Sequence, residues 1–196
     1  MKTTDAYEVV NPSFKTACDL ILAECKTALA QVDPDAVEKL LDAMLMADQV
    51  FFIGVGRVRL SLEAIAKRMA HLGIKTVVVG QITEPAITER DLLIVGSGSG
   101  ETLIPVAIAL KAKSFGAKIA HIGSNPESKL KPITDIFVRI PVRTKLTREG
   151  EINSRQPMTS LFEQSLLLFG DSLACMIVAR RALDIKSLWK YHANLE

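Results

Sequence analysis

The sequence predicts an α/β fold built around a parallel sheet of five strands. Short aliphatic runs of four or five residues alternate with longer segments in which apolar residues recur every three or four positions. The short runs are typical of strands that are covered on both faces, and the longer segments are typical of amphipathic helices. Such alternation favours a parallel sheet with helices packed on its faces. A chain of 196 residues with 48% hydrophobic content is long enough for one such domain.

The elements follow one another in a simple order. Strands are expected at 50–53, 76–79, 92–95, 118–122 and 136–140. Helices are expected at two places before the first strand, over 60–72, over 102–115 and from 160 to about 183. The polar segment 141–157 has no periodicity and is expected to cover the strand ends as a lid. The single domain is therefore divided into two N-terminal helices (12–47), the sheet core (48–140), the lid loop (141–157) and the C-terminal helix and tail (158–196).

Charge and cysteine usage narrow the class of protein. The 24 basic and 22 acidic residues give a net charge of +2 without a long run of either sign, so nothing indicates a nucleic-acid partner. Three cysteines without a CxxC spacing argue for reduced thiols and against a zinc site. The N-terminus lacks the apolar core of a signal peptide, and the longest apolar run is interrupted by Gly170 and Asp171. We expect a soluble cytoplasmic protein with no membrane partner.

The stretch 91–102, DLLIVGSGSGET, predicts an anion-binding loop. Its aliphatic strand ends in three glycines that alternate with hydroxyl residues. Ser97, Gly98, Ser99 and Thr102 then present hydroxyls and main-chain N–H groups at the start of the next helix, whose positive dipole end favours an anion. An ordinary Gly/Ser turn is the alternative, but it does not require hydroxyls that converge on a helix N-terminus.

Two nucleotide sites fit the sequence less well. The stretch GVGRVR after the first strand has only part of a GxGxxG fingerprint, and no acidic residue ends the second strand to hold a ribose. No lysine follows the SGSG glycines as it does in a P-loop. No cofactor and no metal is therefore expected.

Two residues near the C-terminal helix are candidates for proton transfer. Glu163 lies at the start of that helix and suits a general base, although the run Ser160 to Glu163 also fits a capping box. His192 has a side chain suited to proton shuttling, but a histidine near a chain end is usually exposed and idle. Arg57 follows the first glycine loop, where it fits either phosphate binding or solvation. His71 and His121 are interpreted as structural.

Four motifs together resemble a known family. They are GVGR after the first strand, SGSGET after the third, QPMTSLFEQ at the last helix and HANLE at the C-terminus. The chain resembles the sugar isomerase (SIS) domain family over residues 14–196, and within it the 6-phospho-3-hexuloisomerases.

The resemblance implies a three-layer sandwich with a five-stranded parallel flavodoxin-like sheet, assembled as a homotetramer or homodimer. It also implies a sugar-phosphate isomerase that acts through an enediol without metal or nucleotide. The family's phosphate-binding positions fall on Ser97, Ser99 and Thr102, and its catalytic positions fall on Glu163 and His192, the latter acting within its own subunit or across an interface. The alternatives are a non-catalytic sugar-phosphate-binding or regulatory protein, and an isomerase of another phosphosugar.

The chain departs from the family pattern at Thr159, where a glycine usually follows QPM, at Tyr191, where a basic residue usually precedes the tail histidine, and most seriously after GVGR. After GVGR the family typically has Ser-Gly, whereas this chain has Val58 and Arg59. Valine cannot replace the hydrogen bond of a serine hydroxyl. We expect Gly56, Arg57 and Arg59 to contribute further contacts to the substrate. Arg59 is expected to engage the phosphate and so to shift the preferred sugar.

Overall fold

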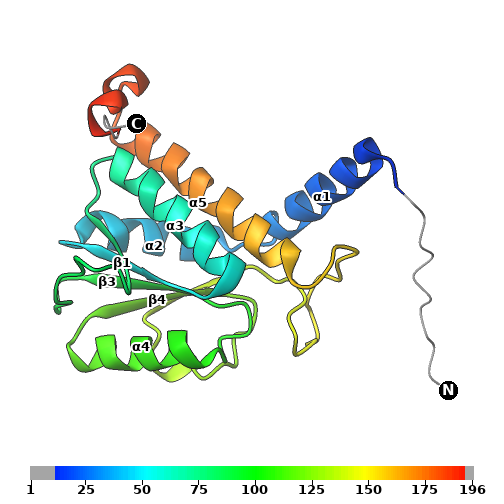
Figure 1. The fold of residues 1–196 in the computed structure, drawn as a ribbon, viewed down its shortest axis with the longest axis horizontal. Coiled ribbons are helices and arrows are strands. Elements are labelled where there is room, and N and C mark those ends of the chain that lie inside the picture. Colours follow the sequence, from blue (N-terminus) through cyan, green and yellow to red (C-terminus); the bar gives the residue numbers. More distant parts are fainter. Residues whose placement is uncertain (1–11, 193–196) are drawn as a thin grey trace.

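The computed structural model, which describes residues 12–192, contains one sheet of five parallel strands in the order β2-β1-β3-β4-β5 (Figure 1). The strands are β1 (Val50–Ile53), β2 (Thr76–Val78), β3 (Leu92–Gly96), β4 (Lys118–Gly123) and β5 (Ile136–Arg139). Each strand begins at the residue expected from its aliphatic run, and each ends within one residue of the expected position. The predicted α/β fold with a five-stranded parallel sheet is confirmed.

Helices cover both faces of the sheet and make three layers (Figure 1). One face packs against α4 (Leu103–Ser114), and the other packs against α2 (Pro34–Met46), α3 (Gly56–His71) and α5 (Ser160–Arg180). The side chains of successive strand residues point to opposite faces, so Phe51 belongs to the core under α4 and Phe52 to the core under the other three helices. This double coverage explains why β1 and β3 are apolar at every position.

The N-terminal helix α1 (Phe14–Leu29) extends away from the sheet and contacts α5 near its base (Figure 1). Its first turn is capped by Ser13, whose hydroxyl accepts a hydrogen bond from the Thr16 N–H at 3.2 Å. Two short 3₁₀ helices complete the chain, η1 (Lys131–Ile133) before β5 and η2 (Ile185–Tyr191) after α5.

The helix α5 is the central helix of its layer. A side chain at Gly170 would overlap Ile65 of α3, so glycine is what allows the two helices to approach each other closely. By length and composition α5 is long and apolar enough to cross a membrane, but 56% of that span is buried inside the fold. Burial on this scale is what a core helix also shows.

The connections of the sheet create a crevice at one edge. The helix after β1 leads to β2 on one side, whereas the helix after β3 leads to β4 on the other side. Neighbouring strands whose helices leave in opposite directions form a topological switch point, where ligands of open α/β sheets bind. The loops after β1 and β3 meet at this point.

Candidate active site

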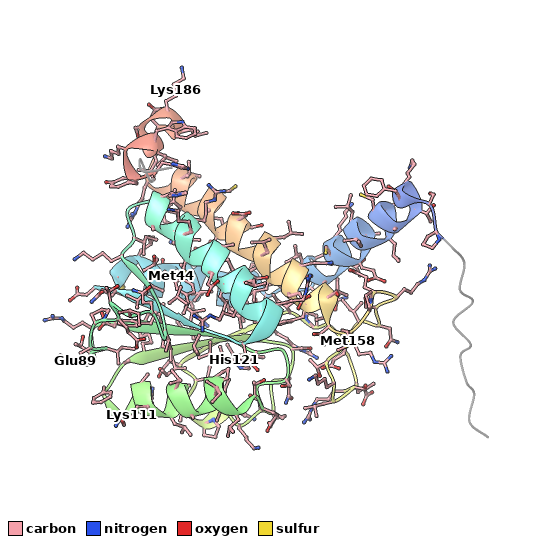
Figure 2. The ribbon with its side chains drawn as sticks, in the orientation of Figure 1. Met44, Glu89, Lys111, His121, Met158 and Lys186 are labelled. Atoms are coloured by element: carbon pink, nitrogen blue, oxygen red, sulfur yellow. The ribbon has the colours of Figure 1, made fainter. Side chains whose placement is uncertain are left out.

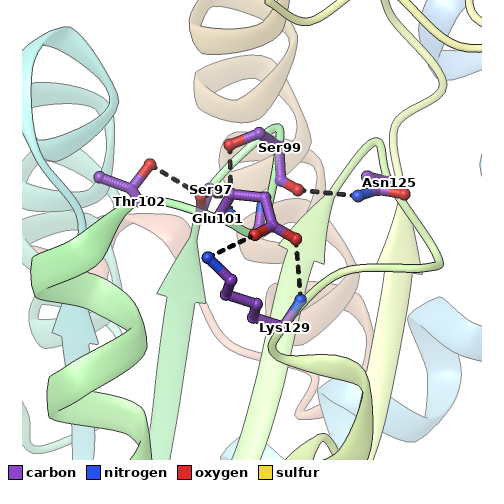
Figure 3. Close-up of polar contacts among 7 residues, drawn as sticks. Ser97, Ser99, Glu101, Thr102, Asn125 and Lys129 are labelled. Carbon is purple, nitrogen blue, oxygen red and sulfur yellow. Dashed lines mark hydrogen bonds and ion pairs between the residues drawn. The ribbon is translucent and has the colours of Figure 1, made fainter. Parts of the chain in front are cut away.

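The loop between β3 and α4 carries the hydroxyls predicted to bind an anion. Ser97 Oγ and Thr102 Oγ1 lie 3.3 Å apart, and Thr102 is the N-cap residue of α4 (Figure 3). The Thr102 hydroxyl makes no capping bond, and it lies beside the first N–H groups of α4, which have no acceptor within the helix. Hydroxyls and main-chain donors gathered at a helix N-terminus suit a phosphate group.

The one acidic residue of this loop is turned away from the hydroxyls. The Glu101 carboxylate accepts a hydrogen bond from the Lys129 N–H at 3.0 Å and pairs with Lys129 Nζ at 3.2 Å (Figure 3). This pairing balances the charge of Glu101 locally. It also ties the loop to the segment that follows β4.

A cavity of about 560 Å³ opens next to the loop. Its lining residues come from the segments after β1 and β3, from the lid loop and from the start of α5; they are Val55, Gly56, Arg57, Val58, Gly96, Ser97, Gly98, Ser99, Thr102, Thr144, Lys145, Pro157, Met158, Thr159, Ser160, Phe162 and Glu163. Seven of the nine residues predicted to form the site line this cavity, and Arg59 and His192 do not.

Glu163 is buried in the first turn of α5 and faces Arg57. The Arg57 Nε–H donates to Glu163 Oε1, while Arg57 itself remains largely exposed to solvent. The Ser61 hydroxyl donates to the Glu163 main-chain oxygen at 2.8 Å and so joins α3 to α5 at this point. The carboxylate is therefore held inside the cavity wall next to a cation.

The capping-box alternative for Glu163 is wrong. The N-cap of α5 is Thr159, and its side chain makes no capping bond. The Ser160 hydroxyl donates instead to the Pro157 oxygen at 2.8 Å, and Glu163 receives its hydrogen bond from Arg57. A tertiary contact from α3 has taken the place of the local bond that the sequence also allowed.

The lid loop contributes two residues to the cavity that sequence reasoning did not single out, Thr144 and Lys145. Glu151 holds this loop in shape, because its carboxylate accepts from the Thr144 N–H and hydroxyl at 3.2 Å and from the Arg148 N–H at 2.9 Å. It also accepts from the Ser124 hydroxyl at 3.2 Å. These bonds fix the segment from which Thr144 and Lys145 line the cavity.

The end of the lid is fastened to α1 by Glu24. Its carboxylate accepts hydrogen bonds from the Ser154 hydroxyl at 2.6 Å, the Arg155 N–H at 2.9 Å and the Gln156 side-chain amide at 3.0 Å. Burial raises the pKa of Glu24, but these hydrogen bonds outweigh it and bring the pKa below its ordinary value of 4.5. Glu24 lies far from this segment in sequence, and no local pattern marked it.

The segment that departs from the family pattern lies partly inside the cavity. Val58 lines it, and its Cγ1 would be 3.1 Å from a side chain placed at Gly96, so valine fits against the glycine at the end of β3. Arg59 points elsewhere and pairs with Glu63 at 2.7 Å. The structure thus places the valine, and not the second arginine, where a ligand would be contacted.

His192 lies far from Glu163 within one chain. It follows η2, stacks on His71 with ring centroids 4.9 Å apart and lies 5.1 Å from the ring of Trp189. There it lines a second cavity, of about 740 Å³, with Arg68, Asp171 and other residues of the far ends of α3 and α5. Because α5 has 21 residues and rises 1.5 Å per residue, its two ends are separated by about 30 Å. The remaining residues of the HANLE motif lie outside the described residues.

Comparison with known proteins identifies the family. A family model for the SIS domain matches residues 44–168, more than half of the chain. The chain belongs to the SIS domain family. It is 38% identical over 176 residues to the 3-hexulose-6-phosphate isomerase of Bacillus subtilis (strain 168), covering 90% of this chain and 95% of that protein. It is also 38% identical to the 3-hexulose-6-phosphate isomerase of Mycobacterium gastri, covering 97% of this chain and 96% of that protein.

A solved structure agrees with the SIS assignment. The fold matches, with a TM-score of 0.79, a Methanococcus jannaschii protein whose crystal structure infers a molecular function of 3-hexulose-6-phosphate isomerase. The two are 29% identical, and the match covers 92% of this chain and 99% of the other. The resemblance stated from the four motifs is confirmed.

Proposed function

We propose that this protein is a sugar-phosphate isomerase that interconverts 3-hexulose 6-phosphate and fructose 6-phosphate through an enediol. The observation that carries the proposal is that the hydroxyl loop after β3 and the buried Glu163 carboxylate line one cavity. Relatives named 3-hexulose-6-phosphate isomerase, matched over nearly their whole length, support the choice of substrate.

Each end of the substrate has its own set of residues in this proposal. The C6 phosphate binds Ser97, Gly98, Ser99 and Thr102 at the N-terminus of α4. The remainder of the sugar extends towards Gly56, Arg57 and the start of α5. Arg59 is left out of direct binding because its guanidinium pairs with Glu63 outside the cavity.

The chemical step is a proton transfer between neighbouring carbons. The Glu163 carboxylate removes the proton from C2 of the 3-hexulose, the C2–H electron pair forms the C2–C3 double bond, and the C3 carbonyl becomes an enediolate oxygen. A proton then passes from the C2 hydroxyl to the C3 oxygen, Glu163 returns the carbon proton to C3, and the C2 oxyanion collapses to a carbonyl to give fructose 6-phosphate. The cations of Arg57 and Lys145, which line the cavity, suit the negative charge that develops on oxygen.

A second subunit supplies His192 in this proposal, because α5 separates His192 from Glu163 in one chain. The outer faces of α3 and α5 support an assembly of two or four copies: Leu60 and Leu167 are exposed and line a shallow hollow beside Glu163. An apolar surface at the rim of the site supports a partner copy that brings its His192 to the cavity. The three free cysteines and the metabolite substrate support a cytoplasmic location.

Mixing two inactive variants tests the shared site. Glu163→Gln and His192→Ala subunits, denatured together in equal amounts and refolded, are expected to recover about a quarter of the wild-type activity, because one combination in four unites an intact Glu163 with an intact partner histidine. Each variant refolded alone is the control. Recovery no greater than the sum of the two controls contradicts a site built across an interface.

A substrate panel tests the function itself. Proton NMR in deuterated water is expected to show interconversion of fructose 6-phosphate with the 3-hexulose and deuterium at the exchanging carbon, while pentose 5-phosphates and aldose phosphates stay unlabelled. Val58 places an apolar wall where the family typically has a hydroxyl, and this observation favours a sugar-phosphate-binding protein without catalysis as the second candidate. That candidate predicts a thermal shift with sugar phosphates and no exchange in any of them.

A further inference from the structure

The mechanism proposed above does not use His121, although its imidazole contacts the predicted phosphate loop. His121 lies on β4 with 1% of its surface exposed, on the α4 side of the sheet (Figure 2). Its Nε2 is 2.9 Å from the Ser97 main-chain oxygen, and its ring centroid is 5.1 Å from that of Phe137. A buried polar ring in this position joins the middle of the sheet to the loop.

The protonation of the ring follows from its partner. A carbonyl oxygen only accepts hydrogen bonds, so Nε2 carries the hydrogen and donates it to Ser97. Burial lowers the pKa of His121 to about 4, which keeps the ring neutral under ordinary conditions. The ring contacts the Ser97 oxygen and the Phe137 ring, and neither group titrates.

Two glycines leave the space that the ring occupies. A side chain at Gly123, two residues along the same strand, would overlap His121 Nε2 and lie 2.6 Å from the Ser97 oxygen. Gly100 has a φ of +65°, and a side chain there would overlap the Ser128 side chain and would also lie 3.0 Å from His121 Cε1. The His121 ring therefore packs against the loop in space that side chains at positions 100 and 123 would restrict.

The carbonyl groups of Ser97, Gly98 and Ser99 each accept a hydrogen bond. The Ser97 oxygen accepts from His121 and from the Gly100 N–H at 3.2 Å. The Gly98 oxygen accepts from the N–H groups of Ser124 at 2.9 Å and Asn125 at 3.2 Å. The Ser99 oxygen accepts from the Asn125 side-chain amide at 3.0 Å (Figure 3).

This arrangement sets the direction of the N–H groups. In a trans peptide the N–H points opposite to the C=O that precedes it. Holding the Ser97 and Gly98 carbonyls against the segment around β4 therefore turns the N–H groups of Gly98 and Ser99 towards the cavity that these residues line. Adjacent N–H groups turned to one side form an anion-binding nest.

We propose that His121 is a positioning residue, which holds the Ser97 peptide so that the loop presents its N–H groups to the substrate phosphate. The inference rests on the proposed role of this loop in phosphate binding. It assigns no chemistry to the imidazole, which acts only through Ser97. Gly123 is required for the same positioning role, because the His121 ring reaches Ser97 only when position 123 has no side chain.

Binding of fructose 6-phosphate and of inorganic phosphate, measured by titration calorimetry, tests the inference through affinity; the fructose 6-phosphate titrations use the Glu163→Gln background, in which turnover is suppressed. His121→Leu is expected to weaken both by about tenfold, the size expected for one lost orienting hydrogen bond. His121→Gln is expected to restore most of the affinity, because a glutamine amide places an N–H near the position of Nε2. Gly123→Ala is expected to weaken binding as His121→Leu does, because it displaces the ring.

The control separates positioning from stability. Ile119→Val lies on the same face of β4, is fully buried and does not touch the loop, so it is expected to lower the melting temperature without changing either affinity. Nitrogen NMR of the wild-type ring should show hydrogen on Nε2 and none on Nδ1. If His121→Leu does not fold, the His121→Gln and Gly123→Ala variants decide the matter. If both bind fructose 6-phosphate and inorganic phosphate as tightly as the wild type does, the inference is overturned.

Failure of the isomerase proposal gives a different pattern. If the wild-type protein shows no proton exchange but His121→Leu binds phosphate more weakly than wild type, the reaction is overturned and the positioning role is supported. Normal exchange with unchanged affinities and unchanged KM in His121→Leu overturns the positioning role and leaves the reaction in place.

Discussion

Replacing Glu163 with glutamine is expected to lower kcat for fructose 6-phosphate by about a thousandfold, within the range that general-base catalysis contributes. The amide has nearly the same shape as the carboxylate and still accepts the hydrogen bond from Arg57, so the cavity wall keeps its form. It has no basic oxygen that can hold the proton taken from carbon. KM is expected to change little, because the phosphate end of the substrate binds to other residues.

The measurement is deuterium incorporation from deuterated water, followed by proton NMR alongside steady-state kinetics. Glu63→Gln is a matched control, since Glu63 also pairs with an arginine of α3 but lies outside the cavity. It is expected to exchange at the wild-type rate. Equal exchange in the Glu163→Gln and wild-type proteins would show that another group moves the proton.

Replacing Arg57 with alanine is expected to lower kcat/KM by about a hundredfold, the loss typical of removing one preorganised donor from a site of developing charge. Two effects combine. The buried Glu163 loses the guanidinium that orients it, and the enediolate loses a nearby cation. Arg57→Lys is expected to recover part of the activity, because it keeps the charge without the planar geometry of the guanidinium.

Arg59→Ala is the internal comparison for this prediction. Arg59 is two residues away on the same helix, but its guanidinium forms a partly exposed pair with Glu63, and such pairs contribute little. A change of less than about twofold in kcat/KM is expected. A loss in Arg59→Ala as large as that in Arg57→Ala would mean that Arg59 moves into the cavity when the substrate binds, as the sequence alone suggested.

Local patterns predicted most of the framework. The strand starts followed from aliphatic runs bounded by turn residues, because burial on both faces of a sheet favours apolar residues along the central strands. The phosphate loop was predicted from glycines and hydroxyls immediately before a helix, since the chemistry of an anion site at a helix N-terminus is local. Glu163 was a candidate for a similar local reason, its place at the start of α5.

Contacts between distant segments could not be predicted in this way. Glu24 and the end of the lid are about 130 residues apart, and Arg57 and Glu163 are separated by 106 residues. The Glu163 capping box was locally reasonable, but Glu163 pairs with Arg57 instead, because a charged guanidinium binds a carboxylate more strongly than a main-chain N–H does. The interpretation of His121 as structural also missed its hydrogen bond to Ser97, because the two residues are 24 positions apart in the sequence.

By itself the sequence determined a parallel α/β sheet, a loop of glycines and hydroxyls at the start of one helix and a carboxylate at the start of another, because each depends on neighbours within a few residues. Only the tertiary structure decided that these two features share a cavity, that Val58 faces it while Arg59 does not, and that His192 lies at the opposite end of α5. The physical reason is that the topological switch between β1 and β3 and the length of α5 set where these residues lie relative to one another. Both arise from how the whole chain packs.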